Sequence, residues 1–211
     1  MAHPNREIPP PIRTLVIMHG VEMTAWLALL LLQPLLIASR KHRLHMQLGK
    51  VGAVLAASIL VTGIWLAIRS ATVTPPEVII WGLAPKPFMA VPFISVVIFG
   101  VFVMLGVIYR RKPHIHRSMM LLATLSALSA AVSRIEPLNS LYVGGVWERL
   151  FGPFFLSLLL GVVLLGIRSV MMRSVDRPFA IGMIALIAAS AGIMQLAPTQ
   201  AWSTFASLLV P

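Results

Sequence analysis

Six long runs of apolar residues, separated by short polar segments, dominate the pattern of this chain. They cover residues 12–39, 51–68, 88–109, 118–134, 150–167 and 178–197. A helix needs about 20 predominantly apolar residues to cross the hydrocarbon core of a bilayer. Inside lipid each backbone polar group must be satisfied internally, which long helices achieve. The pattern therefore predicts an all-α polytopic membrane bundle of about six transmembrane helices, forming a single domain over residues 1–211.

The composition agrees with a membrane protein and excludes several kinds of chemistry. Of the 211 residues, 58% are hydrophobic and 11% are charged. The chain has no cysteine, which excludes disulfides, thiolate-held zinc, iron–sulfur clusters and a cysteine nucleophile. The 12 methionines scatter through the apolar runs and indicate packing, not a copper site. No dedicated metal site is predicted.

The basic residues lie mostly on one side of the predicted bundle. Short loops rich in lysine and arginine stay in the cytoplasm, so the chain is expected to be N-out and C-out in a bacterial inner membrane. The net charge of +11 then orients the chain in the lipid bilayer, and no nucleic-acid partner is predicted. Eleven of the 17 basic residues follow the first, third and fifth runs: Arg40, Lys41, Arg43, Lys50, Arg110, Arg111, Lys112, Arg117, Arg168, Arg173 and Arg177.

Two local features modify this outline. The first run is long, so its helix is expected either to tilt or to bend at Gln33-Pro34. The tail 198–211 has Trp202, Phe205 and Leu208 at helical spacing, which predicts a short amphipathic helix in the outer membrane interface. A frayed tail is the alternative.

Two polar residues of the first run are expected deep in the membrane. His19 and Glu22 are three residues apart and share a helix face. A rise of about 1.5 Å per residue from residue 12 places Glu22 about 15 Å deep, near the midplane. Ionisable residues there are costly and commonly functional. The pair predicts a proton or ligand site that includes Arg134; a structural hydrogen bond to Arg134 or to Ser133 is the alternative.

A weak internal repeat places two histidines at matching points of two helical hairpins. Residues 40–45 are RKHRLH and residues 111–116 are RKPHIH, so both end in an aliphatic residue and a histidine. Equivalent positions of two hairpins can be brought face to face by a pseudo-twofold arrangement. His45 and His116 are then expected at the same depth, near the cytoplasmic surface.

Two neutral imidazoles on facing helices form an axial ligand pair for a b-type haem. Arg43 and Arg117 beside them would match the haem propionates. Two other interpretations stay open, because these basic groups could contact lipid phosphates or hold another metal. If the register is shifted, the ligands would be the neighbouring histidines His42 and His114.

The stretches HRLHMQLGKVG (residues 42–52) and KPHIHRSMMLLATLSALSAAVSRI (residues 112–135) resemble the basic turns of small bacterial inner-membrane proteins to which no function is assigned. More distantly, the layout resembles the six-helix di-haem b-type cytochromes. That resemblance implies histidine pairs at both membrane faces. This chain departs from it, because His19 is the one histidine expected in the outer half of a span, and only the pair His45 and His116 remains for one haem.

Three hypotheses of function follow. The first is a small accessory component or subunit of a larger membrane complex, without a soluble active site. The second is a single b-haem or quinone redox membrane protein with His45 and His116 as axial ligands, in which His19 and Glu22 handle protons. The third is a transporter of a small solute or of protons that uses Glu22. Whether the chain is an enzyme stays open.

Overall fold

The computed structural model describes residues 10–210, and this part of the chain folds as helices joined by short turns. Each of the six candidate spans is long and apolar enough to cross a membrane, so the predicted all-α bundle with six membrane helices is confirmed. The long helices are α1 (Pro10–Ala38), α2 (His42–Val73), α4 (Ala90–Ile108), α5 (Pro113–Val132), α8 (Phe155–Met172) and α9 (Arg177–Leu196). The short ones are α3 (Pro85–Phe88), α6 (Glu136–Asn139), α7 (Val146–Phe151), η1 (Gly152–Phe154) and α10 (Gln200–Leu209).

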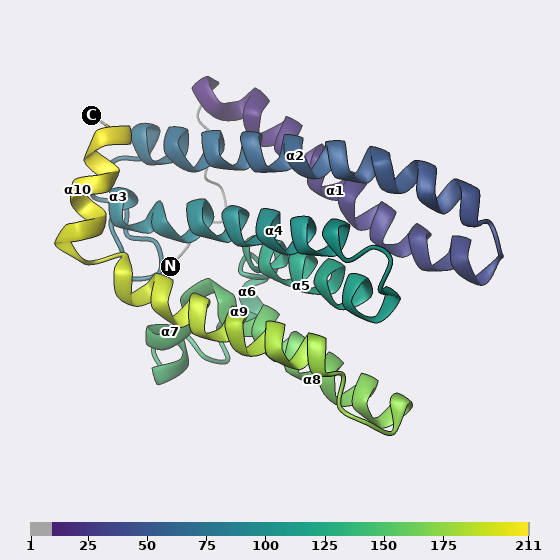
Figure 1. Ribbon diagram of the computed structural model, residues 1–211. Helices are drawn as coiled ribbons and strands as arrows, with labels where there is room; N and C mark the ends of the chain where they lie inside the picture. The colour runs from purple at the N-terminus through teal and green to yellow at the C-terminus, as the bar shows by residue number, and fades with distance from the viewer. Residues whose placement is uncertain (1–9, 211) are drawn as a thin grey trace.

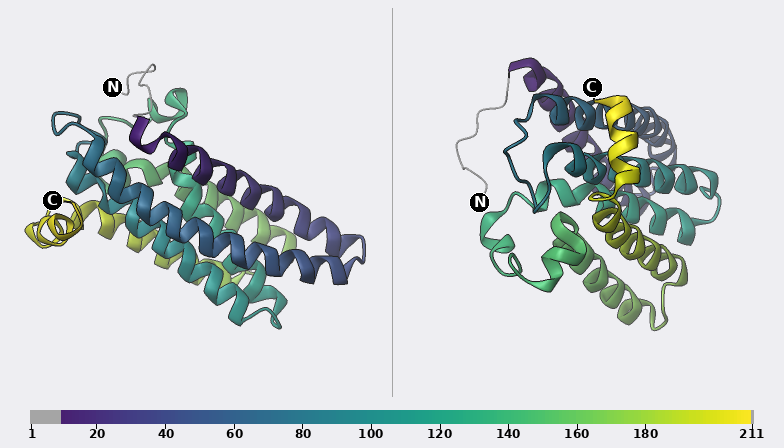
Figure 2. Two further views of the ribbon diagram at one scale, coloured as in Figure 1. Left: turned by 90° about the horizontal axis from the view of Figure 1, so that it is seen from above. Right: turned by 90° about the vertical axis from the view of Figure 1, so that its left-hand side faces the viewer.

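The long helices lie side by side in an order that follows the chain. Helix α1 packs against α2, α2 against α4, α4 against α5, and α5 against α8 and α9 (Figure 1). Helix α10 runs across the end of the bundle at which α9 ends, as both views in Figure 2 show. We call this end the outer end, after the predicted orientation. The opposite, inner end carries the turns at residues 39–41, 109–112 and 173–176.

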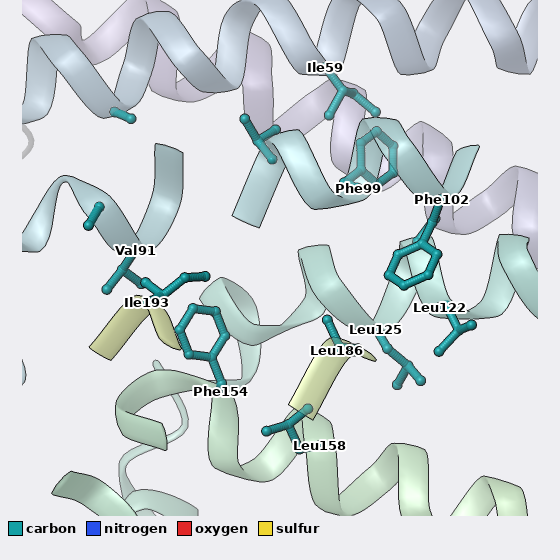
Figure 3. Packing of buried hydrophobic residues seen from close by; sticks show 14 of the residues in the cluster. Ile59, Val91, Phe99, Phe102, Leu122, Leu125, Phe154, Leu158, Leu186 and Ile193 are labelled. Atoms are coloured by element: carbon teal, nitrogen blue, oxygen red, sulfur yellow. The ribbon is translucent and has the colours of Figure 1, made fainter. Parts of the chain in front are cut away.

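Aromatic and aliphatic side chains fill the space between the helices. Phe99 of α4 is fully buried and meets the edge of Trp26 of α1, with ring centroids 5.0 Å apart. Figure 3 shows Phe99 against Ile59 of α2. Interiors of this kind are close-packed, so these contacts fix the spacing of α1, α2 and α4.

The outward faces of the long helices are also apolar. Large side chains such as Leu31, Val54, Val61, Leu160 and Ile184 are exposed. A soluble protein rarely exposes a continuous apolar surface of this kind, whereas lipid solvates it. The chain is therefore a multi-pass integral membrane protein.

The helix boundaries differ from the predicted runs mainly at the inner end. Helix α2 begins at His42, not at residue 51, so the basic segment after the first turn is itself helical. His45 therefore lies in the first turn of a long helix. Helix α1 continues through Pro34 as one helix, although proline lacks the amide hydrogen that would close the preceding turn.

The tail forms the expected short helix and is attached to the bundle. Thr199 caps α10, because its hydroxyl oxygen accepts a hydrogen bond from the Trp202 backbone N–H at 3.2 Å. Trp202 is buried, and its indole N–H donates to the carbonyl oxygen of Lys86 in α3 at 3.3 Å. Its ring also packs against Phe93 of α4. Helix α10 therefore covers the outer ends of α3 and α4.

Candidate functional site

The two histidines of the sequence repeat lie close together at the inner end. His45 is in the first turn of α2, and His116 is in the first turn of α5, which begins at Pro113. Proline is favoured at the start of a helix because its φ angle is already helical and its missing N–H is not needed there. The ring centroids are 6.5 Å apart and the ring planes are nearly perpendicular, at 85°.

A backbone carbonyl fixes the orientation of the His116 ring. Its Nδ1 lies 2.8 Å from the carbonyl oxygen of Gly106, in the last turn of α4. The backbone N–H of Arg110, four residues on, donates to Val107 instead, so this carbonyl is free to accept from His116. A carbonyl oxygen only accepts, so Nδ1 of His116 carries the hydrogen. Nε2 is then the ring atom with a lone pair, which is the arrangement found for histidines that bind metals.

Two buried polar atoms near this pair have no hydrogen-bond partner among residues 10–210. They are Nδ1 of His45 and Oε1 of Gln33. Gln33 of α1 faces the α2 turn after His45, because a Cβ on Gly49 would lie 3.9 Å from its Nε2 atom. Unpartnered buried polar atoms are costly and ask for an explanation. Both lie in the interface between α1 and α2 at the inner end, where the backbone of Gln33 also faces the His45 ring.

Basic residues flank both histidines in the sequence. Arg43 is two residues before His45, and Arg117 directly follows His116; both are exposed. The alternative histidines of each turn, His42 and His114, are exposed as well. The inner end that contains the paired rings therefore carries exposed positive charge, which can bind carboxylate or phosphate groups.

A second polar cluster lies between α1 and α2, nearer the outer end. The two oxygens of Glu22 accept hydrogen bonds from the hydroxyls of Ser58, at 2.5 Å, and Thr62, at 2.6 Å. Nδ1 of His19 lies 2.9 Å from the same Thr62 oxygen and 3.9 Å from Glu22. The Glu22 side chain is largely buried, with 12% of its surface exposed. Its carboxylate therefore relies on these two hydroxyl donors.

The outer arginine and serine predicted beside this cluster make other hydrogen bonds. Arg134 donates through Nη1 to the carbonyl oxygen of Ala130 at 2.7 Å, and the Ser133 hydroxyl donates to the same carbonyl at 3.3 Å. The hydroxyls that hold Glu22 come from α2 instead. Arg134 still lies close enough to act on the charge of His19.

A third cluster, around Asp176, joins three helices at the inner end. Asp176 is buried and accepts from Arg168 of α8, through Nε at 3.0 Å and through Nη2. It also accepts from the Phe179 backbone N–H at 3.3 Å, which caps α9, and Ser118 of α5 lies 3.3 Å from both oxygens. Burial opposes ionisation, but the bonds from Arg168, Phe179 and Ser118 outweigh it and hold the pKa of this carboxyl below its ordinary value. The cluster is structural.

Sequence reasoning did not assign Ser58, Thr62, Gln33 or Asp176 to these clusters. Ser58 and Thr62 are four residues apart in an apolar run, so they share one helix face. That spacing marks a polar helix face that needs a partner, but it does not say which helix supplies the partner. From the sequence, Gln33 is expected only as part of a possible bend, and no pattern singles out Asp176.

Comparison with known proteins found no match to a protein family, a curated protein or a solved structure. In the described part of the chain, no group of three or more histidine, aspartate or glutamate side chains is placed to hold a metal ion. The arrangement of the polar clusters therefore carries the functional argument alone.

Proposed function

We propose that the protein is a membrane redox component that binds one b-type haem at the inner end, with His45 and His116 as axial ligands. The observation that carries this proposal is the distance of 6.5 Å between the two ring centroids. Two imidazoles that share one metal ion through nitrogens at about 2 Å have their ring centres about 6 Å apart. Two helices distant in the sequence thus present their rings at the spacing of a shared ion.

The number of ligands favours haem over a bare metal ion. A protein-held zinc ion takes three or four protein ligands, whereas a porphyrin supplies four nitrogens and leaves two axial positions. Here two imidazoles meet, and in the described part of the chain they are not joined by a third histidine or carboxylate in a group placed to hold a metal ion. Haem iron bound between them would supply one-electron oxidation and reduction.

The neighbouring residues have defined roles in this proposal. The Gly106 carbonyl orients His116 by accepting its Nδ1 hydrogen. Arg43 and Arg117 would bind the two propionates, because a guanidinium forms paired hydrogen bonds with a carboxylate. A single site near one membrane face requires a quinone or a redox partner to bring or remove the electron, so a subunit role in a larger complex is compatible with it.

The optical spectrum of the purified protein tests this proposal. Protein from haem-replete cells is expected to show a haem absorption band that shifts on reduction. His45→Ala and His116→Ala should each abolish the band, because one remaining imidazole does not hold the iron in a bis-histidine site.

Two histidines of the same turns provide matched controls. His42→Ala and His114→Ala remove an exposed imidazole from the same segments, and both should keep the full absorbance. Colourless wild-type protein would refute haem binding and would favour an accessory component without a cofactor. Loss of the band in His42→Ala or His114→Ala, but not in the variants of the pair, would show that the ligands were misassigned.

The proposal includes an orientation, with the basic turns in the cytoplasm of a bacterial cell. It rests on the positive charge of the inner end. Because the chain has no cysteine, a single one can be introduced at an exposed position. Lys112→Cys should react with a membrane-impermeant maleimide only after spheroplasts are lysed, whereas Ser140→Cys, before α7, should react in intact spheroplasts. The reverse labelling pattern would show that the bundle has the opposite orientation in the membrane.

A further inference from the structure

We propose that His19, Thr62 and Glu22 form a proton relay that loads the Glu22 carboxylate from the outer end of the bundle. The inference goes beyond the proposed haem site and does not depend on it. The two sites are also far apart, because Thr62 follows His45 by 17 residues of one helix, or about 25 Å.

The single hydroxyl hydrogen of Thr62 determines where the hydrogens lie before a proton arrives. A threonine hydroxyl has one hydrogen to donate. The 2.6 Å contact to Glu22 is much shorter than the 3.3 Å contact to the Ile59 carbonyl, so this hydrogen is directed at the carboxylate. The 2.9 Å contact between Thr62 and His19 must then use a hydrogen on the ring Nδ1. In this state Glu22 is ionised, and Nε2 of His19 has a free lone pair.

The same distances also fit the opposite arrangement. A proton that arrives at Nε2 of His19 lets the Nδ1 hydrogen move to the Thr62 oxygen while the Thr62 hydrogen moves to Glu22. The products are a neutral His19 with its hydrogen on Nε2 and a protonated Glu22. One proton enters, one is bound, and no heavy atom needs to move far. Donors and acceptors at 2.6–2.9 Å are within the range required for direct transfer.

The surroundings give the relay an entrance on the outer side. His19 is three residues closer to the outer end than Glu22, and its side chain is 21% exposed. Arg134, at the outer end of α5, is the charged group that acts on His19 from outside this pair of helices. Around the relay α2 presents the hydroxyls of Ser58 and Thr62, and α4 presents Val96.

On the inner side an apolar layer follows the relay. Trp26, one helical turn beyond Glu22, is buried, and its indole N–H donates to Thr124 of α5 at 3.1 Å. Phe99 of α4 is fully buried and meets the edge of the Trp26 ring. Trp26, Thr124 and Phe99 are not titratable, so we expect a proton on Glu22 to exchange with the outer end and not with the inner end.

Val96 of α4 and His19 of α1 both approach α2 at Gly63. Gly63 lies beside the ring, and a Cβ there would be 3.1 Å from His19 Cε1 and 2.7 Å from Val96 Cγ2. Glycine therefore allows α4 and the imidazole to approach α2 together.

Infrared spectroscopy of the full chain in lipid vesicles tests the relay. Lowering the pH should produce the C=O stretching band of a buried carboxylic acid, and this band should be absent in Glu22→Gln. Glu136→Gln, which removes an exposed outer carboxylate, should leave the band unchanged. Transfer to D2O then measures how quickly the acid proton exchanges.

The middle residue distinguishes a relay from a structural hydrogen bond. Thr62→Val keeps the shape but removes the hydroxyl, and it should slow the exchange on the order of a hundredfold, as for the loss of a positioned proton-transfer group. Thr62→Ser keeps the hydroxyl and should restore exchange close to the wild-type rate. Equal rates in Thr62→Val and the wild type would refute the relay, as would a titrating band that persists in Glu22→Gln. Neither result bears on the haem spectrum.

Discussion

Asp176→Ala is expected to destabilise the folded bundle by about 3–5 kcal/mol, the usual cost of breaking a buried ion pair by removing one partner. The substitution leaves the Arg168 guanidinium without its acceptor in a partly buried site. It also removes the cap of α9, because the Phe179 backbone N–H loses its side-chain partner. Thermal or denaturant unfolding in mild detergent, followed by circular dichroism, measures the loss.

A neighbouring charge provides the control. Arg177→Ala removes an exposed charge next to Asp176 and should change the stability by less than about 0.5 kcal/mol. If Asp176→Ala is as stable as Arg177→Ala, the cluster does not hold α5, α8 and α9 together.

The contribution of Asp176 also has a defined pH dependence. The folded state holds the pKa of this carboxyl below its ordinary value. Its stabilisation is therefore complete above the unfolded pKa of about 3.9 and is lost as the pH falls through the folded value. The stability difference between the wild type and Asp176→Asn should be constant near neutral pH and shrink below about pH 4.

Gly182→Ala is expected to cost about 1–3 kcal/mol through overpacking between α9 and α5. A Cβ on Gly182 would lie 2.1 Å from Cδ1 of Leu122, which real Cβ contacts do not allow. Leu122 is fully buried and cannot turn outward to make room. The close approach of these helices therefore depends on glycine, as is common in membrane bundles.

The same helix contains a matched control for this substitution. A Cβ on Gly192 of α9 meets no heavy atom within 4 Å, so Gly192→Ala should be neutral or slightly stabilising. Thermal unfolding in mild detergent measures both variants. Equal unfolding midpoints for Gly182→Ala and Gly192→Ala would show that α5 and α9 are not closely packed.

The six membrane helices follow from hydropathy because the bilayer sets a length that a helix must match. The inner helix ends were harder to predict. Arg43 and His45 are polar, yet they belong to α2, because the helix extends beyond its apolar segment. Backbone hydrogen bonding continues where lipid contact stops, so hydropathy underestimates the length of such helices.

The candidate sites could be predicted only in part. The repeat identified His45 and His116, because equivalent hairpins repeat their geometry. The partners of Glu22 could not be chosen from sequence, because the hydrophobic pattern does not encode which helices are neighbours. Ser58 of α2 and Ser133 beyond α5 were both available hydroxyls, and only the packing of α1 on α2 decided between them.

The apolar layer between the two polar clusters has an electrostatic consequence. Glu22 lies level with residue 60 of α2, so it is about 15 residues, or about 22 Å, from His45 along the helix. At an effective dielectric constant of about 20, an elementary charge gained at one cluster changes the energy of a charge at the other by about 0.8 kcal/mol. Packed apolar side chains screen this field less than salt water does, so the charge states of the inner and outer halves of the bundle are coupled without any conformational change.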